Sequence, residues 1–264
     1  MTVEIAVEGH RNLGNAGLSL WRGRFENHDF LWFATTDINA TASTWPILHN
    51  YALTYAICQY SHSAYRGFRP SYDADLDRMS AYALPAQNAS CGRTRFTQNA
   101  IDEITQRTDK IIGSNGKLKD ARFNTPKLGR RVCLTPAMAI PAGSGSAGFE
   151  VYAFGWDNFR PPSVFRLGKK GCPIRVWWEE IQDATPVLDD IVFSPIHPIN
   201  PRDLLGLQAE SLVSFYPAFL PPHLLYTRAT LRKEWKIRLA AGRWIHVPAR
   251  VVRRWQTDVL VQRK

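Results

Sequence analysis

Residues 46–56 read Pro-Ile-Leu-His-Asn-Tyr-Ala-Leu-Thr-Tyr-Ala, and their apolar side chains recur at intervals of three and four. This spacing places those side chains on one face of a helix. Proline is compatible with the first turn of a helix, so Pro46 marks the expected start. The pattern predicts a buried helix over residues 47–60, with His49 and Asn50 close to its N-terminus.

Apolar and aromatic runs on both sides of this helix predict β-strands. Residues 18–35 contain Leu-Ser-Leu-Trp-Arg-Gly-Arg-Phe and then Phe-Leu-Trp-Phe-Ala, which indicates a buried strand and its continuation. Further strands are expected at 149–154 and 174–178. Residues 137–148 are rich in Gly and Ser but lack the Gly-Lys-Ser/Thr ending of a phosphate-binding loop, so they are expected to form a turn. A helix and several strands together give a mixed α+β pattern, and no linker divides residues 1–264 cleanly into separate domains.

The segment at residues 93–131 differs from its surroundings. It holds ten Lys or Arg and four Asp or Glu, has few large apolar residues, and contains Gly-Ser-Asn-Gly at 113–116. The pattern predicts two arms around a tip, projecting from the body of the molecule. Such a hairpin buries little core by itself, so it is expected to order against a partner.

A second basic segment occupies residues 228–264, with eleven Lys or Arg and two Asp or Glu. Around an expected turn at 241–242, Lys236, Arg238 and Arg243 alternate with apolar residues. Alternation is typical of a β-hairpin with one apolar and one basic face. The spacing of the last apolar residues predicts a short closing helix.

The net charge of +10 is therefore distributed unevenly along the chain. The two basic segments carry +6 and +9, whereas the other 188 residues carry −5. Two basic zones on an acidic body indicate a polyanionic partner, because neutralising phosphates is the usual role of such zones. The alternatives are a basic, soluble protein without such a partner, and an anionic membrane surface. Neither zone shows the basic amphipathic helix that membrane binding favours.

Neither a secretion signal nor a membrane span is expected. The N-terminus has no basic region followed by an apolar run, and the most apolar stretch, residues 211–226, is broken by prolines. A soluble, cytoplasmic protein is therefore expected. Cys58, Cys91, Cys133 and Cys172 lie far apart, without the close ligand pairs of a zinc site. We expect four reduced and mostly buried thiols, with no metal and no cofactor.

Three short motifs together carry a family resemblance. They are Leu-His-Asn-Tyr-Ala-Leu-Thr-Tyr-Ala at 48–56, Arg-Leu-Gly-Lys at 166–169 and His-Pro-Ile-Asn-Pro at 197–201. In their order and spacing, residues 18–240 resemble the Cas-five-type (Csc-one) subunit of type I-D CRISPR effector complexes. The resemblance implies a RAMP core of ferredoxin-like or RRM-like βαββαβ topology, with additional C-terminal β elements. It also implies that residues 93–131 are an inserted β-hairpin, called the thumb.

The resemblance further implies a function. Such subunits cap the 5′ handle of the CRISPR RNA, contact the backbone RAMP subunit and the large subunit, and help to recognise target DNA in antiviral defence. Single-stranded RNA is held by phosphate contacts and by stacking of its bases. The residues expected to bind RNA are His49, Asn50, Tyr51, Arg166, Lys169 and Lys170. The thumb residues expected to contact RNA or DNA are Arg122, Lys127, Arg130 and Arg131, and the C-terminal basic face consists of Lys236, Arg238 and Arg243.

Several alternatives remain open at this point. His49 and Tyr51 can instead cap the helix and pack in the core. As a histidine–tyrosine pair they can also serve a metal-independent ribonuclease that processes CRISPR precursor RNA. A third reading is a basic structural RNA-binding protein unrelated to CRISPR. The glycine-rich RNA-binding loop that many RAMP proteins carry near the C-terminus is not evident after Gly206, and residues 168–171 are the nearest analogue. No Ser-His-Asp order or metal cluster stands out, so we expect no enzyme activity.

Overall fold

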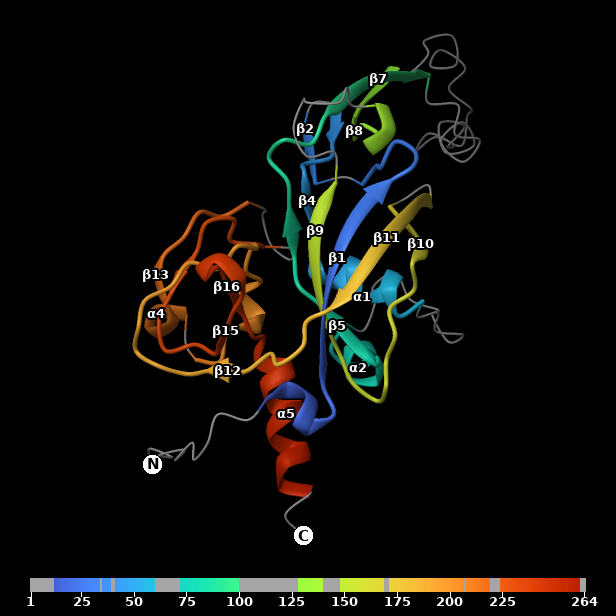
Figure 1. Cartoon of the computed structure of the whole chain (residues 1–264). Helices are drawn as coiled ribbons and strands as arrows, with labels where there is room; N and C mark the ends of the chain where they lie inside the picture. The colour runs from blue at the N-terminus through green and yellow to red at the C-terminus, as the bar shows by residue number, and fades with distance from the viewer. Residues whose placement is uncertain are drawn as a thin grey trace, which may run out of the picture.

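The computed structural model describes residues 12–33, 35–38, 41–59, 72–99, 128–139, 148–168, 171–206, 208–218 and 224–261. Its centre is a curled five-stranded sheet of order β10-β11-β1-β9-β5, in which all neighbours are antiparallel (Figure 1). The strands are β1 (Ser19–Asn27), β5 (Ala81–Ala83), β9 (Phe149–Gly155), β10 (Val164–Leu167) and β11 (Cys172–Glu180). With a few short helices around this sheet, the fold is mixed α+β, as expected.

The two faces of the sheet belong to two separate cores. Side chains alternate along a strand, so Leu20 and Phe25 of β1 point to opposite faces. Phe25 packs in a core with Leu53 of helix α1 (Asn50–Ile57). Leu20 packs in a second core that includes Trp235 from the C-terminal part of the chain. One side of the sheet is thus covered by α1, and the other side is partly covered by the C-terminal residues.

The helix predicted at residues 47–60 is shorter in the structure. Ile47–Leu48 form strand β4, which pairs with β6 (Ala86–Gln87). The carbonyl of Pro46 accepts a hydrogen bond from the N–H of Asn88 (3.0 Å). Because residues 46–48 are held in these extended contacts, the helix begins at Asn50 and not near Pro46.

The two arms of the expected thumb pair with each other. Strands β7 (Arg93–Asn99) and β8 (Leu128–Leu134) are antiparallel along their whole length. They belong to a four-stranded sheet of order β2-β3-β8-β7, with β2 at Thr36–Ile38 and β3 at Thr41–Ser43. This sheet lies above the central sheet in Figure 1. The tip of the thumb, residues 100–127, lies outside the described residues.

The described residues of 184–246 form a C-terminal lobe beside the central sheet (Figure 1). Its sheets are β12-β15-β16 and β13-β14. Strands β15 and β16 form the predicted hairpin, with Lys236 opposite His246, and the predicted closing helix is α5. The bounds are β12 (Pro186–Val187), β13 (Leu212–Ser214), β14 (Thr230–Leu231), β15 (Lys236–Arg238), β16 (Trp244–His246), α4 (Gln208–Ser211) and α5 (Ala249–Val261). The remaining helices are α2 (Tyr72–Arg78) and the 3-10 helices η1 (Leu13–Ala16), η3 (Ala137–Ala139), η4 (Pro201–Asp203) and η5 (Ala240–Gly242).

Within the sheet, four of the strands are ordered β11-β1-β9-β5. Along the chain, α1 comes after β1 and before β5, which is the position of the first helix in the expected βαββαβ core. In the described residues between β9 and β11 the chain forms strand β10 and no helix. The complete ferredoxin-like core therefore stays a prediction. Among the helices that the structure describes, none is long and apolar enough to cross a membrane.

Candidate nucleic-acid interface

The second motif forms the tight turn between β10 and β11. Gly168 has a φ of 80°, and a Cβ at this position would lie 2.7 Å from the carbonyl oxygen of Trp32. Only glycine fits such a backbone without strain. The N–H of Gly171 donates to the carbonyl of Gly168 (3.1 Å), and Arg166 Nη1 donates to the carbonyl of Gly171 (2.8 Å). The turn is thus fixed at both ends, whereas Lys169 and Lys170 lie outside the described residues.

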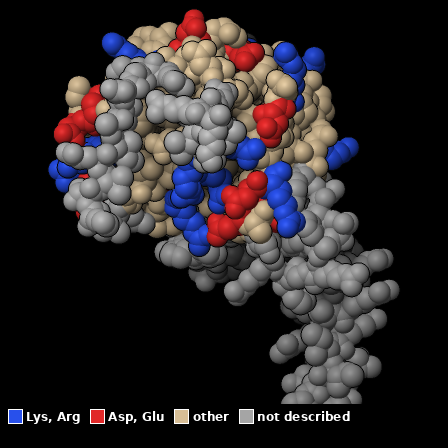
Figure 2. All heavy atoms as spheres, turned by 90° about the horizontal axis from the view of Figure 1, so that it is seen from below, with Lys and Arg blue, Asp and Glu red and all other residues tan. Residues whose placement is uncertain are grey.

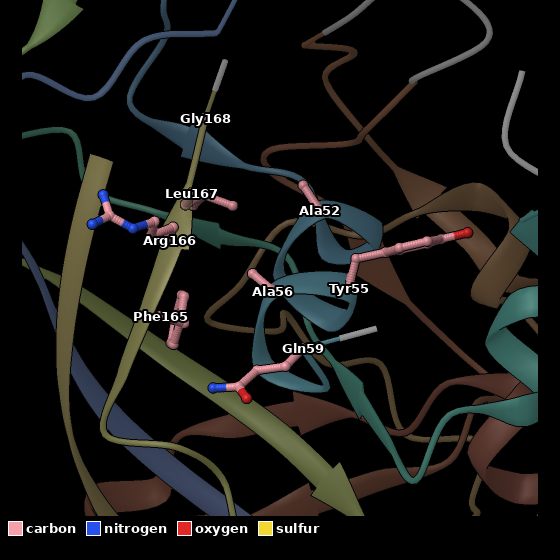
Figure 3. Close-up of a pocket in the computed structure, with 8 residues that line it drawn as sticks. All are labelled: Ala52, Tyr55, Ala56, Gln59, Phe165, Arg166, Leu167 and Gly168. Atoms are coloured by element: carbon pink, nitrogen blue, oxygen red, sulfur yellow. The ribbon is translucent and has the colours of Figure 1, made fainter. Parts of the chain in front are cut away.

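An open groove runs between this turn and helix α1. Its volume is about 490 Å³, within the range of ligand sites in proteins. It is lined by Ala52, Tyr55, Ala56, Gln59, Phe165, Arg166, Leu167 and Gly168 (Figure 3). The first two sequence motifs therefore meet here, α1 contributing one wall and β10 the other. The guanidinium of Arg166 points away from α1 in Figure 3.

The His-Asn-Tyr part of the first motif does not face this groove. His49 caps α1, its Nδ1 accepting from the N–H of Tyr51 (3.2 Å), and the two rings are 4.9 Å apart. Tyr51 is 7% exposed and Asn50 is fully buried. In this arrangement Asn50 offers no side-chain atom to a nucleic acid, and His49 and Tyr51 make the capping and packing contacts that were the alternative expectation.

The third motif meets the first one in the interior. Asn50 Nδ2 donates to Tyr82 Oη (2.8 Å) and Asp203 Oδ2 (3.1 Å), and Asn200 Nδ2 donates to Asn50 Oδ1 (3.1 Å). Tyr82 also donates to the other carboxylate oxygen of Asp203 (2.5 Å). Burial raises the pKa of Asp203 to about 7. We call these four residues the junction network, since they join α1 and β5 to the C-terminal lobe.

A second buried set lies next to the junction network, inside the lobe. His197 Nε2 accepts from the N–H of His246 (3.1 Å), and burial lowers the pKa of His197 to about 3. The ring of His246 contacts Glu234 (3.1 Å), whose pKa stays below its usual value despite burial, because His246 and Ser211 bond to the carboxylate. No cluster of three metal-ligating side chains occurs among the described residues. These side chains are buried and hydrogen-bond to one another in the interior, and they do not line an open site.

Two aromatic contacts fix the base of the thumb. Phe30 and Phe96 meet edge to face at 4.6 Å, and the guanidinium of Arg131 lies over the ring of Trp32 at 4.1 Å. Arg130 lies in β8 opposite Thr97. The side chain of Arg130, like all of Arg122 and Lys127, lies outside what the structure describes. Arg131 thus has a packing contact in addition to any contact with nucleic acid.

The expected C-terminal basic face is interrupted. Lys236 is 1% exposed, forms an ion pair with Asp189 and donates to the carbonyl of Ile191 (3.0 Å). Arg243 pairs with Glu150 of β9 (3.0 Å). Arg238 alone of the three expected cations is exposed and without a carboxylate partner among the described residues. Both sides of β15 are covered at Lys236, because the loop before Phe193 packs over the side expected to be basic.

The cations of α5 are also paired within the molecule. Arg250 contacts the carboxylates of Asp73 and Asp77 in α2, and Arg254 contacts Asp157 (3.1 Å). Figure 2 accordingly shows blue and red residues side by side on the face seen from below. Four cations of the second basic segment, Lys236, Arg243, Arg250 and Arg254, therefore pair with acidic residues within the fold.

Sequence reasoning missed one exposed aromatic residue. Trp177 of β11 is 45% exposed, and the guanidiniums of Arg24 and Arg175 lie 5.2 Å and 5.0 Å from its ring. The signal was present in the alternation of Arg175 and Trp177 along the predicted strand, which places both on one face.

Comparison with known proteins matches the chain to one family. The family described as type I-D CRISPR-associated protein Cas5/Csc1 matches residues 19–254. No curated protein matches the chain. A solved structure, the crystal structure of a CRISPR protein from Archaeoglobus fulgidus, is similar at 12% identity and a TM-score of 0.35, covering 87% of this chain and 99% of that chain. The family match spans all three motifs and both arms of the thumb.

Proposed function

Because this chain belongs to the Cas5/Csc1 family of type I-D CRISPR effector subunits, we propose that it is a non-catalytic subunit that binds and caps the 5′ handle of the CRISPR RNA. In this proposal the thumb contacts the backbone subunit, and the large subunit and target DNA are further partners. The thumb arms that pair in β7 and β8 support an extended contact of this kind.

The observation that carries the proposal is the groove between α1 and the turn at Gly168. Its walls are Ala52 and Ala56 of α1 and the strand β10, and it ends at the glycine turn beside Arg166. Such a groove can contact the bases of single-stranded RNA, while cations and backbone N–H groups at the turn meet its phosphates. Two motifs far apart in the sequence converge on this one surface, which supports a shared binding role.

The contacts of His49 and Tyr51 support the non-catalytic part of the proposal. A general base must reach the proton that it removes. Here the Nδ1 of His49 is engaged by the helix backbone, and Tyr51 is nearly buried, with burial as the main cause of its raised pKa. A phenol with a raised pKa is a poorer proton donor at neutral pH.

The proposal is tested with the purified chain and a labelled RNA of the repeat sequence that carries the 5′ handle. We expect binding without cleavage, and an affinity about tenfold lower for Arg166→Ala, the loss of one charge-assisted phosphate contact. Arg254→Ala is the matched control, because Arg254 lies on α5 with its guanidinium paired to Asp157. The RNA affinity of this variant should equal that of the unaltered chain.

Two results would contradict the proposal. Absence of RNA binding by the unaltered chain would remove its basis. Site-specific cleavage that disappears in His49→Ala would establish the ribonuclease alternative instead.

A further inference from the structure

The face of the central sheet opposite α1 is only partly covered. At one end, Leu20, Tyr152 and Phe154 pack in the core shared with the C-terminal lobe. At the other end, Arg24 of β1 and Trp177 of β11 are exposed. We call this uncovered end the open face. It extends across β1, β11 and β10.

Strand register places Arg166 on the open face as well. Arg24 is paired with Trp177 across β1 and β11, and Arg166 is paired with Pro173 across β10 and β11. Residues 173, 175 and 177 alternate with inward residues of β11, so all three share one face. This agrees with Figure 3, where the guanidinium of Arg166 points away from α1. The groove and the open face are therefore the two sides of the same strand.

Trp177 contacts two cations on the open face. The guanidiniums of Arg24 and Arg175 lie 5.2 Å and 5.0 Å from its ring centroid, within the distance of a cation–π contact. The indole is nevertheless 45% exposed. A large aromatic ring is thus fixed in orientation and still accessible to a ligand.

The charges of the open face leave two cations available. The acidic side chains there are Glu26, Glu150 and Glu179, of which Glu26 pairs with Arg24 and Glu150 pairs with Arg22 and Arg243. Within the described part of the chain, Arg166 and Arg175 have no ion-pair partner. They lie on adjacent strands, on the same side of Trp177, so a chain of phosphates that follows β10 would pass both.

We propose that Trp177 is a stacking platform for a base of single-stranded RNA, with Arg175 and Arg166 binding the neighbouring phosphates. A base of any identity can stack on an indole, and cations beside it meet the charge of the backbone. A protein partner would instead favour a contiguous apolar patch, whereas the exposed apolar side chains here, Trp177 and Val164, are interspersed with arginines. The inference rests on the proposed RNA-binding function and adds to it a second surface, on the other side of β10 from the groove.

The test is RNA affinity of the full chain, measured by fluorescence anisotropy with a labelled single-stranded RNA. Trp177→Ala should lower the affinity about 5- to 100-fold, and Trp177→Phe, which keeps an aromatic ring, should recover most of it. Arg175→Ala should weaken binding and reduce the slope of log affinity against log salt by about 0.7.

Tyr216 provides the matched control. It is 63% exposed on the C-terminal lobe and has Arg228 at 6.0 Å from its ring, so Tyr216→Ala removes a similar exposed aromatic from another surface. Its RNA affinity should stay at the level of the unaltered chain.

Three outcomes overturn the inference. The first is an RNA affinity of Trp177→Ala equal to that of the unaltered chain. The second is an equal loss of RNA affinity in Trp177→Phe and Trp177→Ala. The third is that Trp177→Ala loses a protein subunit from the effector complex while its RNA affinity is unchanged. Should Trp177→Ala fail to fold, Arg175→Ala provides the test, because an unchanged slope of log affinity against log salt in that variant also overturns the inference. Retained affinity in Trp177→Ala refutes this inference alone, whereas no RNA binding by the unaltered chain refutes the proposed function too.

Discussion

The amide of Asn50 uses its oxygen and its nitrogen in three interior hydrogen bonds, to Tyr82, Asp203 and Asn200. A buried polar group left without a partner costs about 1–3 kcal/mol. Truncating Asn50 would leave the carboxylate of Asp203 and the amide of Asn200 each with one contact fewer. Its place in the first motif is therefore explained by the interior, without any contact to RNA.

We predict that Asn50→Ala lowers the free energy of unfolding by about 1–3 kcal/mol and leaves the RNA affinity of the folded protein unchanged. Urea denaturation gives the first quantity and anisotropy with the repeat RNA gives the second. Arg166→Ala is the opposite control, with a clear loss of RNA affinity and a loss of stability limited to its one exposed hydrogen bond to the Gly171 carbonyl. A loss of RNA affinity in Asn50→Ala at unchanged stability would return Asn50 to the list of direct contacts.

At the scale of one element, the turn between β10 and β11 depends on the missing side chain of Gly168. Gly168 and Gly171 both have positive φ, of 80° and 62°. A Cβ on Gly168 would lie 2.8 Å from Leu31 Cδ1 as well as close to the Trp32 carbonyl. The nearest atom to a Cβ on Gly171 is 3.5 Å away, in the side chain of Arg166. The same substitution thus meets a clash at Gly168 and only an ordinary van der Waals contact at Gly171.

Gly168→Ala should therefore destabilise the protein by more than Gly171→Ala. The left-handed backbone alone costs an alanine about 1–2 kcal/mol, and the clash at Gly168 adds to this. Thermal or urea unfolding of the two variants, made side by side, measures the difference. Equal losses of stability would mean that the contact with the Trp32 carbonyl does not constrain the turn.

Element positions were predicted better than element limits. Period-three-and-four spacing correctly predicted α1. Its start moved from Pro46 to Asn50 because β4 pairs with β6, which lies about 40 positions further along the chain. Alternation correctly predicted the β15–β16 hairpin, yet not the burial of Lys236. A periodic pattern indicates which side chains share a face. What covers that face is set by a distant segment, here the loop that carries Asp189.

At the scale of the whole molecule, part of the C-terminal positive charge is paired within the fold, whereas the sequence indicated that it binds a polyanion. Three of the C-terminal cations, Arg243, Arg250 and Arg254, pair with acidic residues from α2, β9 and the loop after β9. Arg250 and Asp73 are 177 positions apart, and no sequence pattern links them. Composition therefore predicted an excess of positive charge correctly, but it could not separate cations engaged inside the fold from those free to bind a polyanion.

Buried ionisable side chains in the C-terminal lobe make the free energy of unfolding of the whole molecule depend on pH. His197 is buried and neutral: its folded pKa is about 3, against about 6.5 for an unfolded histidine. The unfolded chain binds more protons at this site between these values, so the stabilisation is complete above pH 6.5 and is lost as the pH falls toward 3. Glu234, with its lowered pKa, acts in the same direction at more acid pH, whereas Asp203, with its raised pKa, acts in the opposite direction between about pH 4 and 7.

We predict that His197→Gln is less stable than the unaltered chain at pH 7 and that this difference shrinks by about 2–3 kcal/mol at pH 4.5, since glutamine has no proton to gain. Comparing the two proteins cancels the contributions of Glu234 and Asp203, because both retain them. Urea unfolding across this pH range measures the difference, with His28→Gln as a control at an exposed position. A difference that stays constant with pH would show that His197 becomes protonated inside the folded lobe as readily as in the unfolded chain.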